Sequence, residues 1–260
     1  MRFLNITHRD REVHFMSEII FLHLKGLEEL NHRPSTIEAR RKHLARFCAW
    51  IHCNDIEHID HDLIMKYLDR HKVSANYRAS EINHLKKFFA WAYDEDHIKE
   101  NPAARLKRPI RRRGLPRPIG TIDLKRALEA SEGEMKAWLF LAAFAGLRAC
   151  EIAQLSGEDI DRERKLLIIR EQKGGSSGSV PMNQALEPIL EAYPKTGWLF
   201  KKKCGNHIEA AYVSKRANLF LHDLDIDDTF HSLRHWFGTN CYRNSKDLRA
   251  TQEAMRHTSP

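Results

Sequence analysis

The sequence predicts a mainly α-helical protein with one small β-hairpin or sheet, divided into two domains. Its 260 residues exceed the length of a typical single domain. Apolar residues recur at helical spacing over most of the chain, and only residues 166–170 and 179–182 have the composition of short strands. A stretch rich in proline and arginine, residues 106–119, interrupts the helical pattern and marks a linker.

The composition indicates a globular protein with a polyanionic partner. Hydrophobic residues make up 42% of the chain and charged residues 30%, which is enough to build a core. The formal net charge of +8 favours nucleic acid, because Lys and Arg displace counterions from a phosphate backbone, although many basic proteins bind none. No apolar run resembles a signal peptide or could cross a bilayer. The five cysteines are irregularly spaced, which favours reduced thiols in a cytoplasmic protein.

Residues 16–105 are expected to form a helical domain after an N-terminal tail, residues 1–15. One helix carries an apolar stripe between residues 37 and 51, and a second carries another between residues 82 and 92. Basic residues occupy other positions on both helices. For any one of them a solvated surface is the simpler interpretation, but together they predict a surface that contacts phosphates. These residues are Arg40, Arg41, Lys86 and Lys87.

The linker, residues 106–119, concentrates positive charge on a chain that cannot form a helix. Three prolines and a glycine keep it extended. A nuclear-localisation or solubilising role is one interpretation, and a connector that lies along DNA between the two domains is the one we favour. Its six cationic residues are Lys107, Arg108, Arg111, Arg112, Arg113 and Arg117.

Residues 120–260 are expected to form a second, mostly helical domain. Residues 136–147 are strongly apolar and should form a buried helix that stops at Gly146. The two predicted strands should pair through a glycine-rich turn, residues 173–178. Helices return after the hairpin, including one near residues 231–244.

Five side chains at four places in this domain are candidates for one catalytic site, and their order is more informative than any one of them. The first arginine follows a buried helix and a glycine turn, and Glu151 lies one helical turn later and could brace it. The central histidine and arginine are three residues apart, so they share a helix face. Taken singly, each has an ordinary structural explanation. The five are Arg148, Lys173, His231, Arg234 and His257.

In this order the residues resemble the sequence boxes of tyrosine site-specific DNA recombinases of the phage integrase kind. Residues 145–155 look like the first arginine box, and Lys173 is similar in setting to the β-hairpin lysine. Residues 230–237 look like the His-x-x-Arg box, and residues 252–259 like the box that follows. The resemblance implies a helical, SAM-like core-binding domain joined by the linker to a tyrosine-recombinase catalytic domain.

The resemblance also implies a reaction without metal or other cofactor. A tyrosine hydroxyl displaces a 5′-oxygen from a DNA phosphate and forms a 3′-phosphotyrosine. Arg148 and Arg234 would clamp the non-bridging oxygens, and His257 would add a donor. Lys173 would be the general acid, and His231 would assist proton transfer at the nucleophile. The expected partner is double-stranded DNA at an attachment-type site, on which the protein forms a dimer or tetramer in the bacterial cytoplasm or nucleoid.

The sequence departs from the family in two places. The family tyrosine follows the last histidine box by roughly ten residues, about three helical turns, whereas His257 is followed here only by three residues without a tyrosine. Arg256 stands where the family usually has glycine. We therefore expect residues 120–260 to lack the C-terminal tyrosine segment and the chain to bind DNA without cutting it alone.

Two interpretations of this departure remain: a truncated recombinase, or a non-catalytic competitor or regulator at the recombination site. A metal-dependent nuclease is disfavoured, because the sequence shows no carboxylate cluster of the kind that two-metal chemistry requires.

Overall fold

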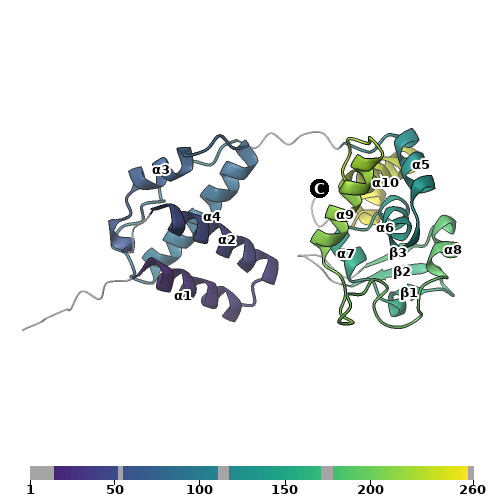
Figure 1. Cartoon of the computed structure of the whole chain (residues 1–260), viewed down its shortest axis with the longest axis horizontal. Coiled ribbons are helices and arrows are strands. Elements are labelled where there is room, and N and C mark those ends of the chain that lie inside the picture. The colour runs from purple at the N-terminus through teal and green to yellow at the C-terminus, as the bar shows by residue number, and fades with distance from the viewer. Residues whose placement is uncertain (1–14, 52–54, 111–116, 171–177, 257–260) are drawn as a thin grey trace, which may run out of the picture. The chain divides into compact units, whose positions relative to one another are not determined.

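The chain divides into two compact units, residues 1–113 and 114–260, which we call the N-terminal unit and the C-terminal unit (Figure 1). The structure is a computed structural model that describes residues 15–51, 55–110, 117–170 and 178–256.

The N-terminal unit is built from helices around an aromatic core. Among the described residues its α-helices are α1 (Met16–Glu29), α2 (Pro34–Ile51), α3 (His61–Asp69) and α4 (Ala75–Asp94). Phe47 packs edge to face against Tyr67 and Phe89. This geometry suits aromatic rings, whose edges are positive and whose faces are negative. Leu106 is also buried in this core, so the first residue of the predicted linker is anchored to the N-terminal unit.

Arg40 corrects one of the sequence predictions. It is only 3% exposed and lies among α1, α2 and α4, so the prediction that it contacts DNA from the surface is wrong. The spacing along α2 explains this burial. Arg40 follows Ile37 by three residues and precedes Leu44 by four, so it falls within the buried stripe of the helix. Its Nε donates to Nδ1 of His84 at 2.9 Å, and its Nη1 lies 3.1 Å from Nε2 of His23.

The C-terminal unit wraps helices around one apolar helix and adds a small sheet. Its helices are α5 (Thr121–Ala130), α6 (Gly133–Phe144), α7 (Ala149–Ala153), α8 (Glu187–Leu190), α9 (Ala210–Asp223), α10 (Phe230–Ser245) and α11 (Leu248–Ala254). The antiparallel sheet has the order β1 (Ile160–Asp161), β2 (Leu166–Ile169), β3 (Gly178–Pro181). The predicted pairing of the two hairpin strands is confirmed, with Ile168 opposite Ser179. The two-residue strand β1 was not predicted, because it is too short to show alternation.

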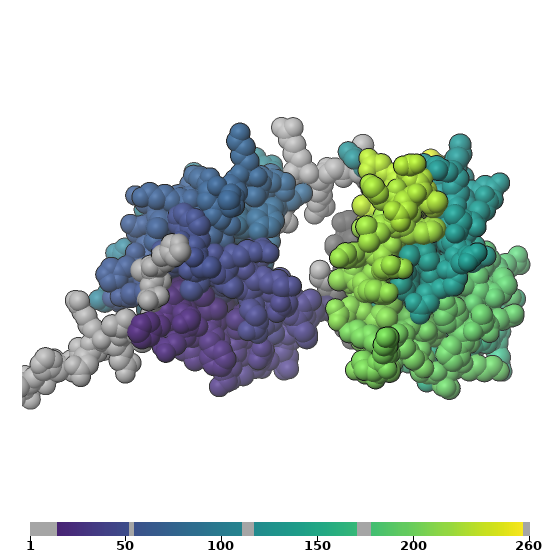
Figure 2. Space-filling view, in the orientation of Figure 1, coloured from purple at the N-terminus to yellow at the C-terminus, as the bar shows by residue number. Residues whose placement is uncertain are grey.

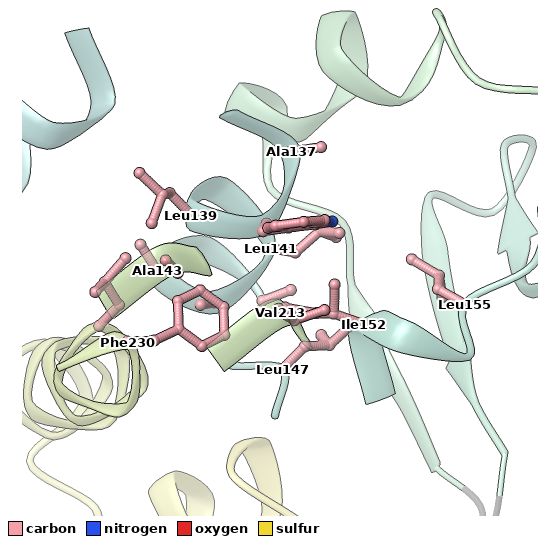
Figure 3. Close-up of a cluster of buried hydrophobic side chains, with 14 of the residues drawn as sticks. Ala137, Leu139, Leu141, Ala143, Leu147, Ile152, Leu155, Val213 and Phe230 are labelled. Carbon is pink, nitrogen blue, oxygen red and sulfur yellow. The ribbon is translucent and has the colours of Figure 1, made fainter. Parts of the chain in front are cut away.

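Helix α6 is the centre of the C-terminal core. Its Leu139, Leu141 and Ala143 are buried beside side chains from α7, α9 and α10, such as Val213 and Phe230 (Figure 3). Figure 2 shows the face of this unit on which α9 and α10 lie beside the earlier helices of the same unit. Burial on several sides explains why the α6 sequence is apolar rather than amphipathic.

The linker enters the C-terminal unit at Ile119. This side chain is buried in the core, and its backbone N–H donates to the carbonyl of Ser232 on α10 at 3.2 Å. Between the anchored Leu106 and Ile119, the described residues Lys107, Arg108 and Arg117 are exposed. The predicted DNA contacts Arg111, Arg112 and Arg113 lie outside the described residues.

Two neutral imidazoles accept the hydrogen bonds of buried Arg40. Among the described side chains no carboxylate pairs with it. A guanidinium only donates, so a ring nitrogen facing it has to accept, which requires the unprotonated imidazole. Burial, together with the charge of Arg40, lowers the pKa of His23 to about 4. Burial, with His43 and Arg40 nearby, lowers the pKa of His84 to about 4 as well. The packing of α1, α2 and α4 thus depends on uncharged histidines.

We predict that the free energy of unfolding of the N-terminal unit falls as the pH is lowered from about 6.5 towards 4. In this window the unfolded chain takes up protons that folded His23 and His84 do not, which removes up to about 1.4 kcal/mol per pH unit for each histidine. His84→Gln keeps an acceptor for Arg40 but cannot be protonated, so its stability should depend less steeply on pH. Urea unfolding followed through the amide signals of α2 and α4 measures this.

The exposed His71 provides the matched control, since His71→Gln should leave the pH dependence as it is in the wild type. A wild-type stability that does not change between pH 6.5 and 4 would show that the histidines do not carry this effect.

Candidate functional site

Arg148 is placed by the turn that follows α6. Gly146 has a φ of +61°, a conformation that glycine adopts without strain, and it turns the chain so that Arg148 becomes the N-cap residue of α7. Glu151 lies in the first turn of α7. Its Oε2 accepts from the backbone N–H of Arg148 at 2.6 Å, and its Oε1 accepts from Nη1 of the same residue at 2.8 Å. The predicted brace between these two residues is confirmed. The Arg148 side chain is 37% exposed, so part of it faces solvent.

Arg234 is buried beside the same turn. It lies on α10, is 2% exposed, and donates from Nη1 to the carbonyl of Gly146 and from Nη2 to the carbonyl of Met255. Its Nη1 is also 3.9 Å from Oε2 of Glu151. Burial and the nearby charge of Arg148 lower the pKa of Arg234 to about 10, which leaves it protonated at neutral pH. Arg234 therefore ties α10 to the turn after α6 and to the end of α11.

Two glycines allow this close packing. A Cβ on Gly146 would lie 2.4 Å from Cδ1 of Phe237, and a Cβ on Gly238 would lie 2.6 Å from the sulfur of Met255. Both distances are shorter than atoms can approach without displacement. A side chain at position 146 would displace the ring of Phe237, and one at position 238 would displace the side chain of Met255.

A third arginine, Arg256, completes the group around Glu151. It follows α11, and its Nη2 donates to Oε2 of Glu151 at 2.9 Å and lies 3.4 Å from the carbonyl of Gly146. In the sequence Arg256 is only a departure from the family pattern, and no local signal assigns it to the site. Its φ of +50° explains why glycine suits this position. We call Arg148, Arg234, Arg256 and Glu151 the arginine cluster.

The arginine cluster carries an excess of positive charge. Three guanidiniums and one carboxylate give a net charge of +2. Burial alone would raise the pKa of Glu151, but Arg256, the Arg148 amide, and the charges of Arg234 and Arg148 outweigh it and hold that pKa below its ordinary value. Glu151 is thus charged at neutral pH, and the excess charge fits an anion.

The other predicted catalytic residues are only partly located. His231 occupies the first turn of α10, one turn before Arg234, where it is exposed and its ring packs edge to face against His235 with centroids 4.5 Å apart. Lys173 and His257 lie outside the described residues. The structure brings Arg148 and Arg234 together, and the convergence of all five side chains on one point stays a prediction.

The predicted DNA contacts of the N-terminal unit differ in how they are held. Lys86 donates to the carbonyls of Ala104 and Leu106 at 3.0 and 3.1 Å, so it holds the chain where the linker begins. Arg41 is exposed and lies between Glu28 and Glu38. Lys87 is exposed on α4.

No described helix is long and apolar enough to span a membrane.

Comparison with protein families finds matches for both units. Residues 122–260 match the phage integrase family, and residues 22–96 match the N-terminal SAM-like domain of phage integrases. Tyrosine recombinase XerC 2 from Ralstonia nicotianae is 27% identical over 90% of this chain and 77% of its own length. A tyrosine recombinase from Thermosipho africanus is 25% identical over 88% of this chain and 86% of its own length.

Solved structures show the same likeness. The integrase from mycobacterium phage Brujita is 28% identical, with a TM-score of 0.52 over 94% of this chain and 85% of that chain. A lambda integrase tetramer bound to a Holliday junction is 17% identical, with a TM-score of 0.78 over 99% of this chain and 82% of that chain. At 17% identity, the likeness to the lambda integrase tetramer shows a shared fold and no more.

We predict that Glu151→Gln lowers the free energy of unfolding of the C-terminal unit by about 3 kcal/mol, because it leaves buried guanidiniums without their counter-charge. Urea unfolding at neutral pH measures the loss. Glu129→Gln is the matched control, since Glu129 is exposed and pairs with Lys125 at 3.7 Å; it should change stability by less than about 0.5 kcal/mol. Equal, small losses in both variants would mean that Glu151 does not hold the cluster together.

Proposed function

Because this chain belongs to the phage integrase family, whose relatives here are tyrosine recombinases, we propose that it acts in site-specific DNA recombination. In this proposal both units bind duplex DNA, and the C-terminal unit presents the arginine cluster to one phosphate of the backbone. The observation that carries the proposal is the net charge of +2 around buried Glu151, with Arg148 partly exposed beside it.

The chemistry requires fixed cationic donors around the phosphorus atom. Arg148 offers the part of its guanidinium that is not bound to Glu151. Within the described part of the chain, Arg234 uses two of its five N–H groups on main-chain carbonyls, and in this proposal the others meet a phosphate that enters beside Arg148. Such preorganised donors typically contribute about 3–4 kcal/mol each to a transition state that carries developing negative charge.

The remaining roles follow the family resemblance. We assign Lys173 as the general acid that protonates the leaving 5′-oxygen and His257 as a further donor to the phosphate. His231 would assist proton transfer at the attacking tyrosine. Its exposed position at the start of α10 leaves its ring accessible to DNA.

Duplex DNA at an attachment-type site is the proposed partner, and self-association on that DNA is part of the proposal. Structural neighbours include a lambda integrase dimer bound to a core site and the tetramer bound to a Holliday junction. In this chain Lys87, Lys107 and Arg108 are exposed cations that suit phosphate contacts. A bacterial cytoplasm and a phage or mobile-element origin agree with this role.

The covalent step needs a nucleophile that these 260 residues do not place after His257. We propose that the 260-residue polypeptide binds DNA without cutting it alone. A second candidate function is that of a non-catalytic competitor or regulator that occupies the recombination site. That function would leave DNA affinity almost unchanged in Arg148→Ala, because it needs no phosphate held for attack.

We predict that the 260-residue polypeptide shifts duplex DNA but forms no covalent complex. Suitable DNA can be enriched from a random-sequence pool by the protein itself and then nicked at successive positions to trap the intermediate. An otherwise identical polypeptide, extended so that a tyrosine follows His257 by about ten residues in a helix, should form a denaturant-resistant adduct. The same extension with phenylalanine is the control. Absence of an adduct from the tyrosine form at every nick would contradict the recombinase function.

We also predict that Arg108→Ala weakens binding to duplex DNA and reduces the slope of log affinity against log salt by about 0.9, the change expected for one lost phosphate contact. Fluorescence anisotropy over a range of salt concentrations measures it. Lys125→Ala should leave the slope unchanged, because Lys125 lies beside Glu129 on α5. A slope that Arg108→Ala does not alter would place the linker away from DNA.

A further inference from the structure

Arg256 has a backbone conformation that a residue with a Cβ adopts only at a cost. Its φ of +50° lies in the left-handed region. Five other non-glycine residues among those the structure describes have positive φ, and all five side chains are exposed. Arg256 differs, because its side chain is only 11% exposed. Strain of this kind persists where surrounding contacts hold the residue in place.

The contacts of Arg256 run from Glu151 to the base of the β-hairpin. Its Nη2 binds Oε2 of Glu151 at 2.9 Å. A Cβ on Gly178, the first residue of β3, would lie 3.3 Å from Cδ of Arg256, so the aliphatic part of the side chain passes this strand. Its Nε is buried and has no hydrogen-bond partner within the described part of the chain. Arg256 therefore holds the carboxylate that braces Arg148, and within the described residues its Nε–H remains without an acceptor.

We propose that Arg256 is a positioning residue that acts through Glu151 to fix Arg148 for an incoming phosphate and adds one positive charge to the anion site. The inference rests on the proposed phosphate-binding role of the arginine cluster. Both carboxylate oxygens of Glu151 are hydrogen-bonded. Oε1 accepts from the Arg148 side chain, and Oε2 accepts from Arg256 and from the Arg148 amide. Without Arg256 the net charge of the cluster falls from +2 to +1.

The influences on the pKa of Glu151 also support a main role for Arg256 in holding this carboxylate. After burial, which raises it, the charge of Arg256 has the largest influence, ahead of Arg234 and the side-chain charge of Arg148. The charge of Arg256 thus favours the charged carboxylate more than the charge of either other arginine does.

Two substitutions distinguish the positioning role of Arg256 from a purely structural role. Arg256→Gly removes the guanidinium but places at this φ the residue that adopts it most easily. Arg256→Lys keeps the charge and loses the two-pronged geometry. If Arg256 only connects the end of α11 to the turn after α6, both variants change stability and neither changes how the site binds an anion.

The test is titration with inorganic phosphate at constant ionic strength, followed through the Nε–H signal of Arg148 in ¹⁵N-correlated NMR spectra. In the wild type the signal should shift with saturation. In Arg256→Gly the apparent phosphate affinity should fall about tenfold, corresponding to a loss of about 1.4 kcal/mol, and the starting position of the Arg148 signal should move. Arg256→Lys should recover part of the affinity.

Lys246→Gly is the matched control. Lys246 also has a positive φ, of 54°, and also contributes one positive charge, but it is exposed at the end of α10. Its substitution should change phosphate affinity less than twofold. A folded Arg256→Gly variant with wild-type phosphate affinity and an unmoved Arg148 signal overturns the positioning role alone. A wild-type chain whose Arg148 signal does not respond to phosphate overturns the proposed anion site, and with it this inference. If Arg256→Gly does not fold, wild-type affinity in Arg256→Lys overturns the positioning role, and a severalfold loss supports it.

Discussion

The arginine cluster depends on the carboxylate of Glu151, which is only 4% exposed and lies among three guanidiniums. It pairs with Arg148 and Arg256 and lies 3.9 Å from Nη1 of Arg234. The three arginines come from different parts of the chain: the turn after α6, the second turn of α10 and the second residue after α11. Their mutual repulsion would separate these segments if no anion lay between them. A charged carboxylate buried alone would be equally unfavourable. The two kinds of charge therefore stabilise each other, and the site is assembled by that balance.

Backbone geometry determines which groups can take part in this balance. Gly146 turns the chain so that its carbonyl faces Arg234, and the absence of a Cβ there leaves room for Phe237. Gly238, within α10, leaves room for the side chain of Met255, whose carbonyl also accepts from Arg234. The buried guanidinium thus binds main-chain carbonyls, and Glu151 is left to pair with Arg148 and Arg256. The proposed anion site therefore centres on the partly exposed Arg148, while backbone carbonyls hold the most deeply buried arginine in place.

How far the sequence predicts this arrangement depends on how far apart the interacting residues lie. The pair of Arg148 and Glu151 follows from spacing along one helix, and α6 and the hairpin follow from apolar runs and a glycine-rich turn. The contact between Arg256 and Glu151 spans 105 positions, and no local pattern encodes it. Arg40 is a different case. Its place in the apolar stripe of α2 was visible in the sequence, but its charge suggested the surface, because buried arginines are rare.

The two units bury arginine in opposite ways, and their response to acid should differ for that reason. Arg40 is accommodated by His23 and His84, which have to remain neutral, whereas Arg256 is accommodated by Glu151, which has to remain charged. The lowered pKa values of the two histidines mean that the N-terminal unit begins to lose stability once the pH falls below about 6.5, where the unfolded histidines start to bind protons. The lowered pKa of Glu151 means that its contribution persists above the ordinary glutamate pKa and is lost only as the pH falls through the lower folded value. Mild acid should therefore weaken the N-terminal unit while the arginine cluster is still intact.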